Sequence, residues 1–397
     1  MQINNSQEFL PGTGGVDRYA VARGGFAHFM LKEIYDQPEA ARSMIEGCVD
    51  GSGHVTLPGF SLSPDEIRAF SKISIAGSGS SRHAGIVGEF MLERITRLPV
   101  EVDFASQYCY RDPLADPNEL CIFISQSGTT VDTLAALHQA RRKGSKSVAI
   151  CNVSDSPLTR NADATLLTHA GEEVAIAATK SFTSQLVALL LLSAYIAQNQ
   201  ITKNESKVHA RVQAAVRQLR FLPKLIEAVL TVNEKCREYA EEFGRCSDFI
   251  FAGRDIDYAI ALEGALKLKE VCYIHAQAYP TGELKHGPAA LIDKRLPMVV
   301  LATHDQQDEG SVLRYQKSVS MIRELAEREI PVLAIITEGD QEIPGVASHV
   351  VSVPAIPVLL QPILEVIPLQ FLAYHIAVLG GHNVDQPRNL CKSVVME

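Results

Sequence analysis

The sequence predicts an α/β protein made of two tandem doubly wound, flavodoxin-like subdomains with flanking helices and a C-terminal tail. Short apolar, β-branched segments alternate with helical patterns or Gly/Ser turns, which is typical of parallel βαβ units. The same order of segments returns in the second half of the chain, 176 positions from Ala76 to Ala252 and 185 from Cys151 to Ile336. A Leu- and Ala-rich stretch with helical spacing separates the two halves. We therefore expect two copies of one parallel-sheet unit.

The first half should contain an N-terminal part and the first subdomain. Residues 1–25 show little periodicity and are predicted to be a leader or linker. Residues 26–70 are predicted to be a helical segment that breaks at Pro38. The first subdomain is expected over residues 71–205, with strands at the apolar runs 73–76, 120–124, 147–151 and 164–167.

The second half should repeat this plan and end in a tail. Helical spacing predicts connecting helices over residues 206–245. The second subdomain is expected over residues 246–384, with strands at 249–252, 298–301, 331–336 and 349–353. Residues 385–397 contain Pro387 and no long apolar run, so we predict an extended tail laid over another part of the protein.

Composition restricts the class of protein. The 397 residues are 46% hydrophobic and 21% charged, which is enough apolar surface to offset chain entropy. A protein with a net charge of −9 lacks the broad basic face that nucleic-acid binding requires. The eight cysteines form no CxxC pair and no zinc-ligand spacing, so we expect free thiols and no metal site. No signal-peptide pattern is present and the longest apolar run, 186–192, is too short to span a membrane, which predicts a cytoplasmic protein.

Two loops that follow predicted strands could bind an anion. They are residues 77–81 (Gly-Ser-Gly-Ser-Ser) and residues 125–130 (Ser-Gln-Ser-Gly-Thr-Thr). A loop between the carboxyl end of a strand and the start of a helix presents N–H groups and hydroxyls to an anion. Neither loop matches the P-loop pattern, and Arg82 replaces the third glycine of a dinucleotide-binding motif. The loops therefore favour a phosphomonoester over a nucleotide; the alternative is two ordinary βα turns.

Three charged residues of the second half fall on one helical face. Glu263, Lys267 and Glu270 have helical spacing, and their helix follows Gly253, the counterpart of the first anion loop. This face should therefore point into a ligand crevice, where a carboxylate could move a proton and a lysine could neutralise an enediolate. Taken alone, the same pattern is also typical of a solvated helix face.

Two single residues complete the candidates. His286 lies in a Gly- and Pro-bounded loop, where it could act as an acid or base near neutral pH, although a lone histidine is more often structural. Lys392 lies close to the chain end and is either a mobile surface lysine or part of a site that the tail covers.

Together these motifs resemble the sugar isomerase (SIS) family, most closely the isomerase domain of the glutamine–fructose-6-phosphate aminotransferases (glucosamine-6-phosphate synthases). The similarity runs from about residue 26 to Glu397. The Ser-Gln-Ser-Gly sequence at 125–128 is shared by all SIS proteins. The more specific blocks lie at 29–38, 178–183, 262–270, 282–288 and 385–393.

The resemblance implies an enzyme of amino-sugar metabolism, without a cofactor, that interconverts fructose 6-phosphate plus ammonia with glucosamine 6-phosphate. The phosphate would be held by Ser81, Ser125, Gln126, Ser127 and Thr130. Other substrate contacts would come from Ser80, Glu173, Ile176, Ala178 and Cys391. Glu270, beside Lys267, would move the proton between C1 and C2.

The resemblance also implies a homodimer. His286, supplied by the neighbouring subunit, would open the sugar ring. Lys392 would form a Schiff base with the open-chain ketose, for which a tail folded over the pocket would desolvate it.

Departures from the synthases leave alternatives open. Ala178 stands where the synthases have serine, and residues 79–85 and 172–178 look more like SIS-type glucosamine-6-phosphate deaminases, so a catabolic deaminase is one alternative. A non-catalytic sugar-phosphate-binding regulator is another, but it would not need the acid, base and Schiff-base residues. The first cysteine is Cys48, so we expect no glutaminase nucleophile in this chain. Ammonia would then come from solution or from a separate glutaminase chain.

Overall fold

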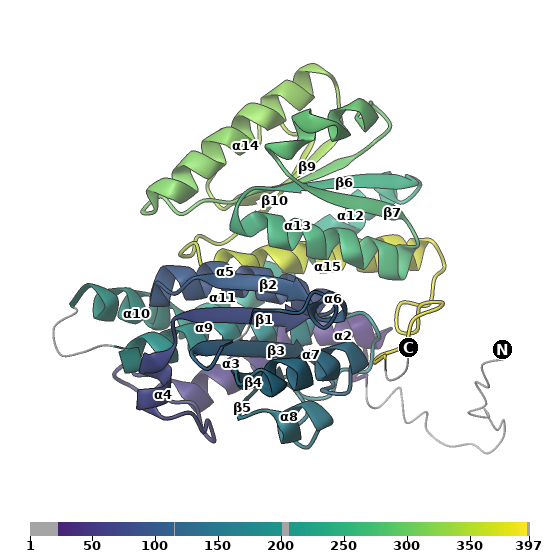
Figure 1. Cartoon of the computed structure of the whole chain (residues 1–397). Coiled ribbons are helices and arrows are strands. Elements are labelled where there is room, and N and C mark those ends of the chain that lie inside the picture. Colours follow the sequence, from purple (N-terminus) through teal and green to yellow (C-terminus); the bar gives the residue numbers. More distant parts are fainter. Residues whose placement is uncertain (1–22, 115, 201–205, 395–397) are drawn as a thin grey trace, which may run out of the picture.

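The computed structural model describes residues 23–114, 116–200 and 206–394. Most of the predicted leader and the last three residues of the predicted tail therefore lie outside the described residues. The described chain forms two parallel five-stranded sheets, one from each half, with helices on their faces (Figure 1). This confirms the predicted fold class, whereas the limits given above for leader, subdomains and tail stay predictions.

The first sheet has the strand order β2-β1-β3-β4-β5, and all its pairs are parallel. This is the flavodoxin-like order, in which ligands bind at the carboxyl ends of the strands where the order reverses, between β1 and β3. Its strands are β1 (Lys72–Gly77), β2 (Val100–Phe104), β3 (Glu119–Ser125), β4 (Lys146–Cys151) and β5 (Ala164–Leu167).

The second sheet repeats this topology with the order β10-β9-β8-β6-β7, again with parallel pairs only. Strand β6 takes the place of β1 and β7 that of β2, so the two sheets are copies of one arrangement. The strands are β6 (Asp248–Gly253), β7 (His275–Pro280), β8 (Met298–Ala302), β9 (Val332–Thr337) and β10 (His349–Val353).

Backbone geometry supports the duplication. Gly77 and Gly253 end equivalent strands, and at both a Cβ atom would come within 3.0 Å of the backbone of the following helix. Two residues later, Gly79 (φ 55°, ψ −130°) and Asp255 (φ 60°, ψ −129°) share one unusual conformation. Glycine adopts this conformation easily, whereas Asp255 is strained in it. The second copy therefore keeps the turn of the first copy although it lacks the glycine.

The helices of the first half begin with α2 (Phe29–Tyr35) and α3 (Gln37–Cys48). The break between them falls at Asp36, and Pro38 occupies the first turn of α3, where its missing N–H is tolerated. The others are α4 (Pro64–Ala69), α5 (Ser80–Thr96), α6 (Ala105–Tyr108), α7 (Val131–Arg142), α8 (Pro157–Asn161) and α9 (Lys180–Gln200).

The linking region is helical, as the sequence predicts, with α10 (Ser206–Leu219), α11 (Leu222–Val229) and α12 (Asn233–Phe243). The second half adds α13 (Ile256–Lys267), α14 (Glu309–Glu327) and α15 (Gln361–Leu379). Helix α13 continues into a π-helical turn, η2 (Leu268–Cys272), and two short 3₁₀ turns follow, η3 (Glu283–His286) and η4 (Pro288–Leu291).

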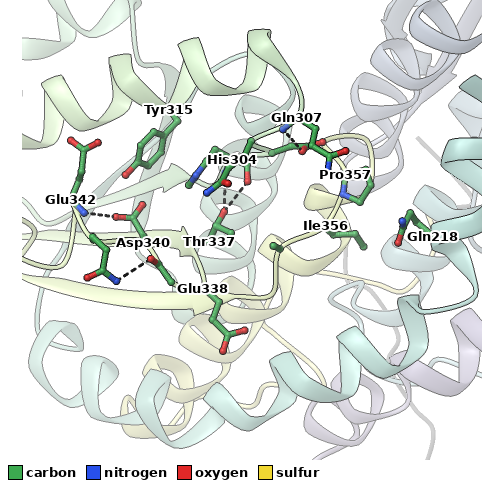
Figure 2. A pocket seen from close by; sticks show the side chains of 15 residues that line it. Gln218, His304, Gln307, Tyr315, Thr337, Glu338, Asp340, Glu342, Ile356 and Pro357 are labelled. Carbon is green, nitrogen blue, oxygen red and sulfur yellow. Dashed lines mark hydrogen bonds between the residues drawn. The ribbon is translucent and has the colours of Figure 1, made fainter.

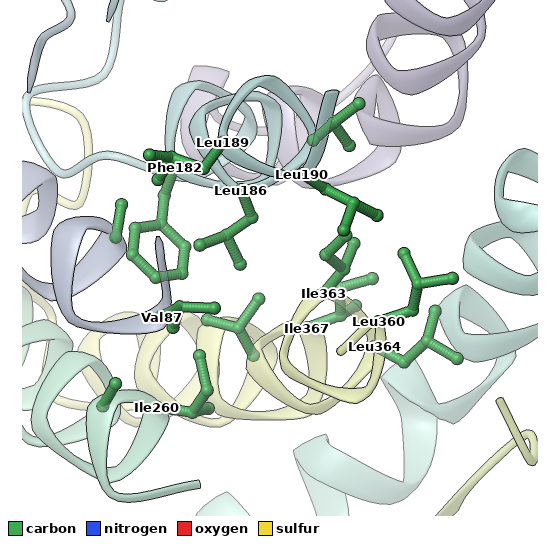
Figure 3. Packing of buried hydrophobic residues seen from close by; sticks show 14 of the residues in the cluster. Val87, Phe182, Leu186, Leu189, Leu190, Ile260, Leu360, Ile363, Leu364 and Ile367 are labelled. Atoms are coloured by element: carbon green, nitrogen blue, oxygen red, sulfur yellow. The ribbon is translucent and has the colours of Figure 1, made fainter. Parts of the chain in front are cut away.

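One hydrophobic core joins the two halves. Alternate residues of each strand point to opposite faces, so Leu120 and Ile122 of β3 face this core while Cys121 and Phe123 face a separate outer cluster. Helices α9 and α15 meet in the shared core, to which Leu186 and Leu190 of α9 and Ile363 and Ile367 of α15 all belong (Figure 3).

This position explains why α9 and α15 are unusually apolar. Both helices are long and apolar enough to cross a membrane, yet 89% of each apolar window is buried inside the protein. Core helices of this kind give the same signal as a membrane span.

Candidate active site

A cavity of about 250 Å³ lies at the carboxyl ends of β1 and β3, the place where the strand order reverses. Its wall is built from the two predicted anion loops, from residues 173–178, from the π-helical turn and from the tail. The structure brings most of the predicted site residues together here: Ser80, Ser81, Ser125, Gln126, Ser127, Thr130, Glu173, Ile176, Ala178, Glu270, Cys391 and Lys392. Lys267 lies beneath this wall, and His286 lies elsewhere.

The first anion loop has two serine hydroxyls, of which Ser81 can donate to a ligand and Ser80 already donates to another side chain. Ser81 Oγ accepts a hydrogen bond from Gln185 Nε2 of α9 at 3.1 Å, which leaves its own proton available to a ligand. Ser80 Oγ instead donates to Glu263 at 2.7 Å and accepts from Lys267 at 3.2 Å. The Ser80 hydroxyl therefore links the two halves of the protein, although the residue lines the cavity.

In the second anion loop, the hydroxyl groups form hydrogen bonds with one another and with N–H groups of the loop. Ser125 Oγ accepts the N–H of Gly128 at 3.1 Å and lies 3.1 Å from Thr130 Oγ1. Ser127 Oγ accepts the N–H of Thr129 at 3.2 Å. The loop leads into α7, whose N-terminal dipole adds to the attraction of an anion.

The predicted Glu/Lys face is buried in the contact between the halves. Lys267 is 0% exposed, and its Nζ lies 3.1 Å from Glu263 and 2.5 Å from Glu270. Burial would lower the pKa of Lys267, but these two carboxylates outweigh it and raise the pKa, so the side chain stays an ammonium ion. Because the π-helical turn begins at Leu268, Glu270 stays above Lys267 and reaches the cavity wall.

Glu263 anchors this group to the first half. Its carboxylate accepts the hydrogen bond of Ser80 and lies 2.8 Å from His83 Nδ1 of α5. Burial would raise the pKa of Glu263, but Lys267, His83 and Ser80 together lower it to about 2. The sequence placed Glu263 on the right helix face, yet contained no sign of its partner His83, which lies on the other half of the chain.

The tail closes the cavity and carries Lys392 into it. Lys392 Nζ lies 2.6 Å from Glu173 Oε2 and 2.6 Å from the carbonyl oxygen of Ala175. The tail is fixed by Ser393, whose hydroxyl lies 3.0 Å from Ser127 and 2.7 Å from Thr129. Sequence reasoning missed Ser393, although it directly follows the lysine that it helps to place.

Glu173 is a buried carboxylate in the loop that precedes α9. It accepts the N–H groups of Thr179 and Ser181 at 3.0 Å, and the Ser181 hydroxyl at 2.7 Å. Burial would raise the pKa of Glu173, but the Lys392 ammonium and these donors lower it below its ordinary value. Glu173 is therefore an ionised partner that holds Lys392 at the cavity.

Two further predicted residues, His286 and Cys391, are both exposed. His286 is exposed in η3 and does not line the cavity of its own chain. Cys391 is an exposed thiol in the cavity wall, whereas five of the eight free cysteines are buried: Cys48, Cys121, Cys151, Cys236 and Cys272.

A second, larger hollow of about 590 Å³ lies beside the carboxyl ends of β8 and β9 (Figure 2). Its charged residues are acidic, Asp305, Glu338, Asp340 and Glu342, and its lining includes no lysine or arginine. A phosphate dianion would be repelled there, so this hollow suits an anion less well than the first cavity does.

Comparison with known families gives one match on each half of the chain, in agreement with the two sheets. The SIS domain family matches residues 66–195 and 245–380, one match on each half of the chain. The chain belongs to the SIS domain family. This confirms the resemblance that the sequence motifs indicated.

Several known proteins resemble the chain over nearly its whole length. The glutamine–fructose-6-phosphate aminotransferases of Thermus thermophilus and Chlorobaculum tepidum are 46% and 42% identical over 95% of this chain. The chain spans 60% of the length of these relatives. The solved C-terminal domain of the Francisella tularensis glucosamine–fructose-6-phosphate aminotransferase has a TM-score of 0.83 and 34% identity, covering 92% of this chain and 99% of that domain. A Thermotoga maritima glucosamine-6-phosphate deaminase, at 24% identity and a TM-score of 0.68, shares the fold; the match covers 93% of this chain and 100% of the deaminase chain.

Proposed function

We propose that this SIS protein is a sugar-phosphate isomerase of amino-sugar metabolism that joins ammonia to fructose 6-phosphate and forms glucosamine 6-phosphate. One observation carries the proposal. A single cavity holds hydroxyl-rich anion loops at one side and a carboxylate and a tail lysine, Glu270 and Lys392, at the other. A hexose phosphate suits such a cavity, because its phosphate needs the anion loops and its carbonyl end needs the carboxylate and the lysine.

The phosphate would lie against the loops that follow β1 and β3. Hydroxyls of Ser81, Ser127 and Thr130 and the N–H groups at the starts of α5 and α7 suit the three oxygens of a phosphomonoester. With the phosphate fixed there, the carbonyl end of the sugar would extend toward the π-helical turn and the tail.

The chemistry would start at Lys392. Its amine loses a proton and attacks C2 of the open-chain ketose, and loss of water leaves a Schiff base. Ammonia would then add to C2 of this Schiff base and release the Lys392 amine, which leaves an imine at C2. Glu270 would take a proton from C1 and return it at C2 while the C1 hydroxyl proton moves to the nitrogen, leaving an aldehyde at C1 and the amino group on C2. Such a transfer suits a carboxylate beside a fixed ammonium ion such as Lys267.

Ring opening would need a residue from a second chain. Since His286 is exposed and does not line the cavity of its own chain, we propose that it acts at the cavity of a partner in a homodimer. Ammonia would come from solution or from a glutaminase, and the enzyme would work in the cytoplasm.

The test is turnover by the purified chain. Fructose 6-phosphate with ammonium should give glucosamine 6-phosphate, glucosamine 6-phosphate should release ammonia, and Lys392→Ala should abolish both. Because one site serves both directions, the ratio of the two rates at cellular ammonia concentration decides between synthase and deaminase. Absence of turnover in either direction, with phosphoglucose isomerisation also absent, would overturn the proposal; sugar phosphate binding without turnover would indicate a regulator.

A further inference from the structure

The sequence block at 29–38 has no part in the site described above, yet it contacts both segments that hold Lys392. The block forms α2 and the first turn of α3. One contact is made by Glu33 with the loop at 173–175, and the other by the start of α2 with Asp385 of the tail.

Glu33 fixes the loop that presents the acceptors of Lys392. Its side chain is 1% exposed, and Oε1 accepts the N–H groups of Val174 at 2.5 Å and Ala175 at 3.3 Å. The flanking groups, the Glu173 carboxylate and the Ala175 carbonyl oxygen, are the two acceptors that hold Lys392. The other carboxyl oxygen, Oε2, is buried without a hydrogen-bond partner among the described residues.

Asp385 fixes the other end of the same arrangement. Its carboxylate accepts the N–H groups of Phe29 at 3.0 Å and Met30 at 2.8 Å. Its carbonyl oxygen accepts the N–H of Ile176 at 3.0 Å. The tail that carries Lys392 therefore starts from a residue bonded both to α2 and to the loop that Glu33 holds.

We propose that α2 is the positioning element of the active site and that Glu33 is the positioning residue that keeps Lys392 beside the reacting carbon of the sugar. The inference rests on the proposed function, because it takes the Lys392 amine as the group that reacts.

The charge state of Glu33 fits this role. Burial, together with the neighbouring charge of Glu173, raises the pKa of Glu33 to about 8, so its carboxyl group is largely neutral at pH 7. A neutral carboxyl group accepts both N–H bonds without placing a second negative charge beside Glu173. Glutamine preserves that acceptor, whereas leucine keeps the volume of the side chain and removes the acceptor.

The test is reductive trapping of fructose 6-phosphate on Lys392 of the full chain with borohydride, followed by mass spectrometry. Glu33→Leu should trap about tenfold more slowly than the wild type, because the amine is no longer held in place. Glu33→Gln should stay within about threefold, since the acceptor is retained. Glu39→Leu is the matched control, because Glu39 lies on the neighbouring α3 with its side chain 70% exposed, and it should trap at the wild-type rate.

A second readout separates this inference from the proposed function. Acetic anhydride without sugar labels exposed amines, and Glu33→Leu should label Lys392 severalfold faster than Glu39→Leu while the fully buried Lys267 stays unlabelled. If the wild type traps no sugar, the proposed function fails, and the labelling still decides the role of Glu33. Equal labelling and equal trapping in Glu33→Leu and Glu39→Leu would overturn the inference.

A third variant covers the case in which Glu33→Leu does not fold, which labelling of Lys267 would reveal. Asp385→Asn weakens the same arrangement from the tail and should raise Lys392 labelling and slow trapping in the same direction. Wild-type values for Asp385→Asn would then overturn the inference.

Discussion

At the scale of single residues, two adjacent serines at the start of α5 should differ in what they do. Ser81 has a free hydroxyl proton because it accepts from Gln185, so Ser81→Ala should raise the KM for fructose 6-phosphate about tenfold through the loss of a hydrogen bond to a charged group. Ser80→Ala should change KM little but lower the free energy of unfolding by about 1–3 kcal/mol, because Glu263 and Lys267 lose a buried partner. Steady-state kinetics and urea unfolding check both. Equal KM effects in the two variants would contradict this assignment.

A buried carboxyl group that does not line the candidate active site should make stability depend on pH. Glu365 of α15 lies with Asp257 and Thr303 around Arg314, and burial raises its pKa from 4.5 to about 7. The folded state then holds a proton between pH 4.5 and 7 that the unfolded state releases, so the free energy of unfolding should fall as pH rises through this range. Glu365→Gln should show a smaller decrease in urea unfolding at pH 5 and pH 7.5. The same slope in variant and wild type would show that Glu365 does not titrate there.

At the scale of elements, Gly264 allows α13 to pack closely against α15 and β6. A Cβ atom at Gly264 would lie 2.7 Å from Leu369 of α15 and 2.7 Å from Phe251 of β6, so Gly264→Ala should destabilise the protein by about 1–3 kcal/mol through overpacking. Gly47 of α3 faces open space, and Gly47→Ala should instead stabilise by about 0.5–1 kcal/mol. Thermal unfolding of both variants checks the contrast. If Gly264→Ala and Gly47→Ala both lowered the stability, close helix packing would not explain the difference between the two positions.

The elements also show what the sequence could predict. Eight strands contain short apolar, β-branched runs that predict them. Neither β2 nor β7 was predicted from the sequence, because these equivalent edge strands have exposed positions and their apolar signal is too weak. The face of Glu263, Lys267 and Glu270 follows from helical spacing. The π-helical turn that aims Glu270, and the contacts of His83 and Gln185 with residues distant in sequence, depend on tertiary packing and leave no local pattern.

At the scale of the whole molecule, the absence of His286 from the cavity lining of its own chain should make the active unit a dimer. A mixture of inactive Lys392→Ala and His286→Ala chains should recover about a quarter of the wild-type activity, because half of the randomly mixed dimers would carry one intact site of two. The assay is glucosamine 6-phosphate formation after the two variants are unfolded and refolded together. Variants that recover no activity while they form mixed dimers would contradict a shared site.

The most direct measurement is a crystal structure of the chain with fructose 6-phosphate. The two halves and the tail are expected to act on one ligand, with the phosphate on the hydroxyls of Ser81, Ser127 and Thr130 and with C1 and C2 next to Glu270 and Lys392. A phosphate found in the acidic hollow beside β8 and β9, or a sugar whose carbonyl end points away from Glu270 and Lys392, would contradict this account.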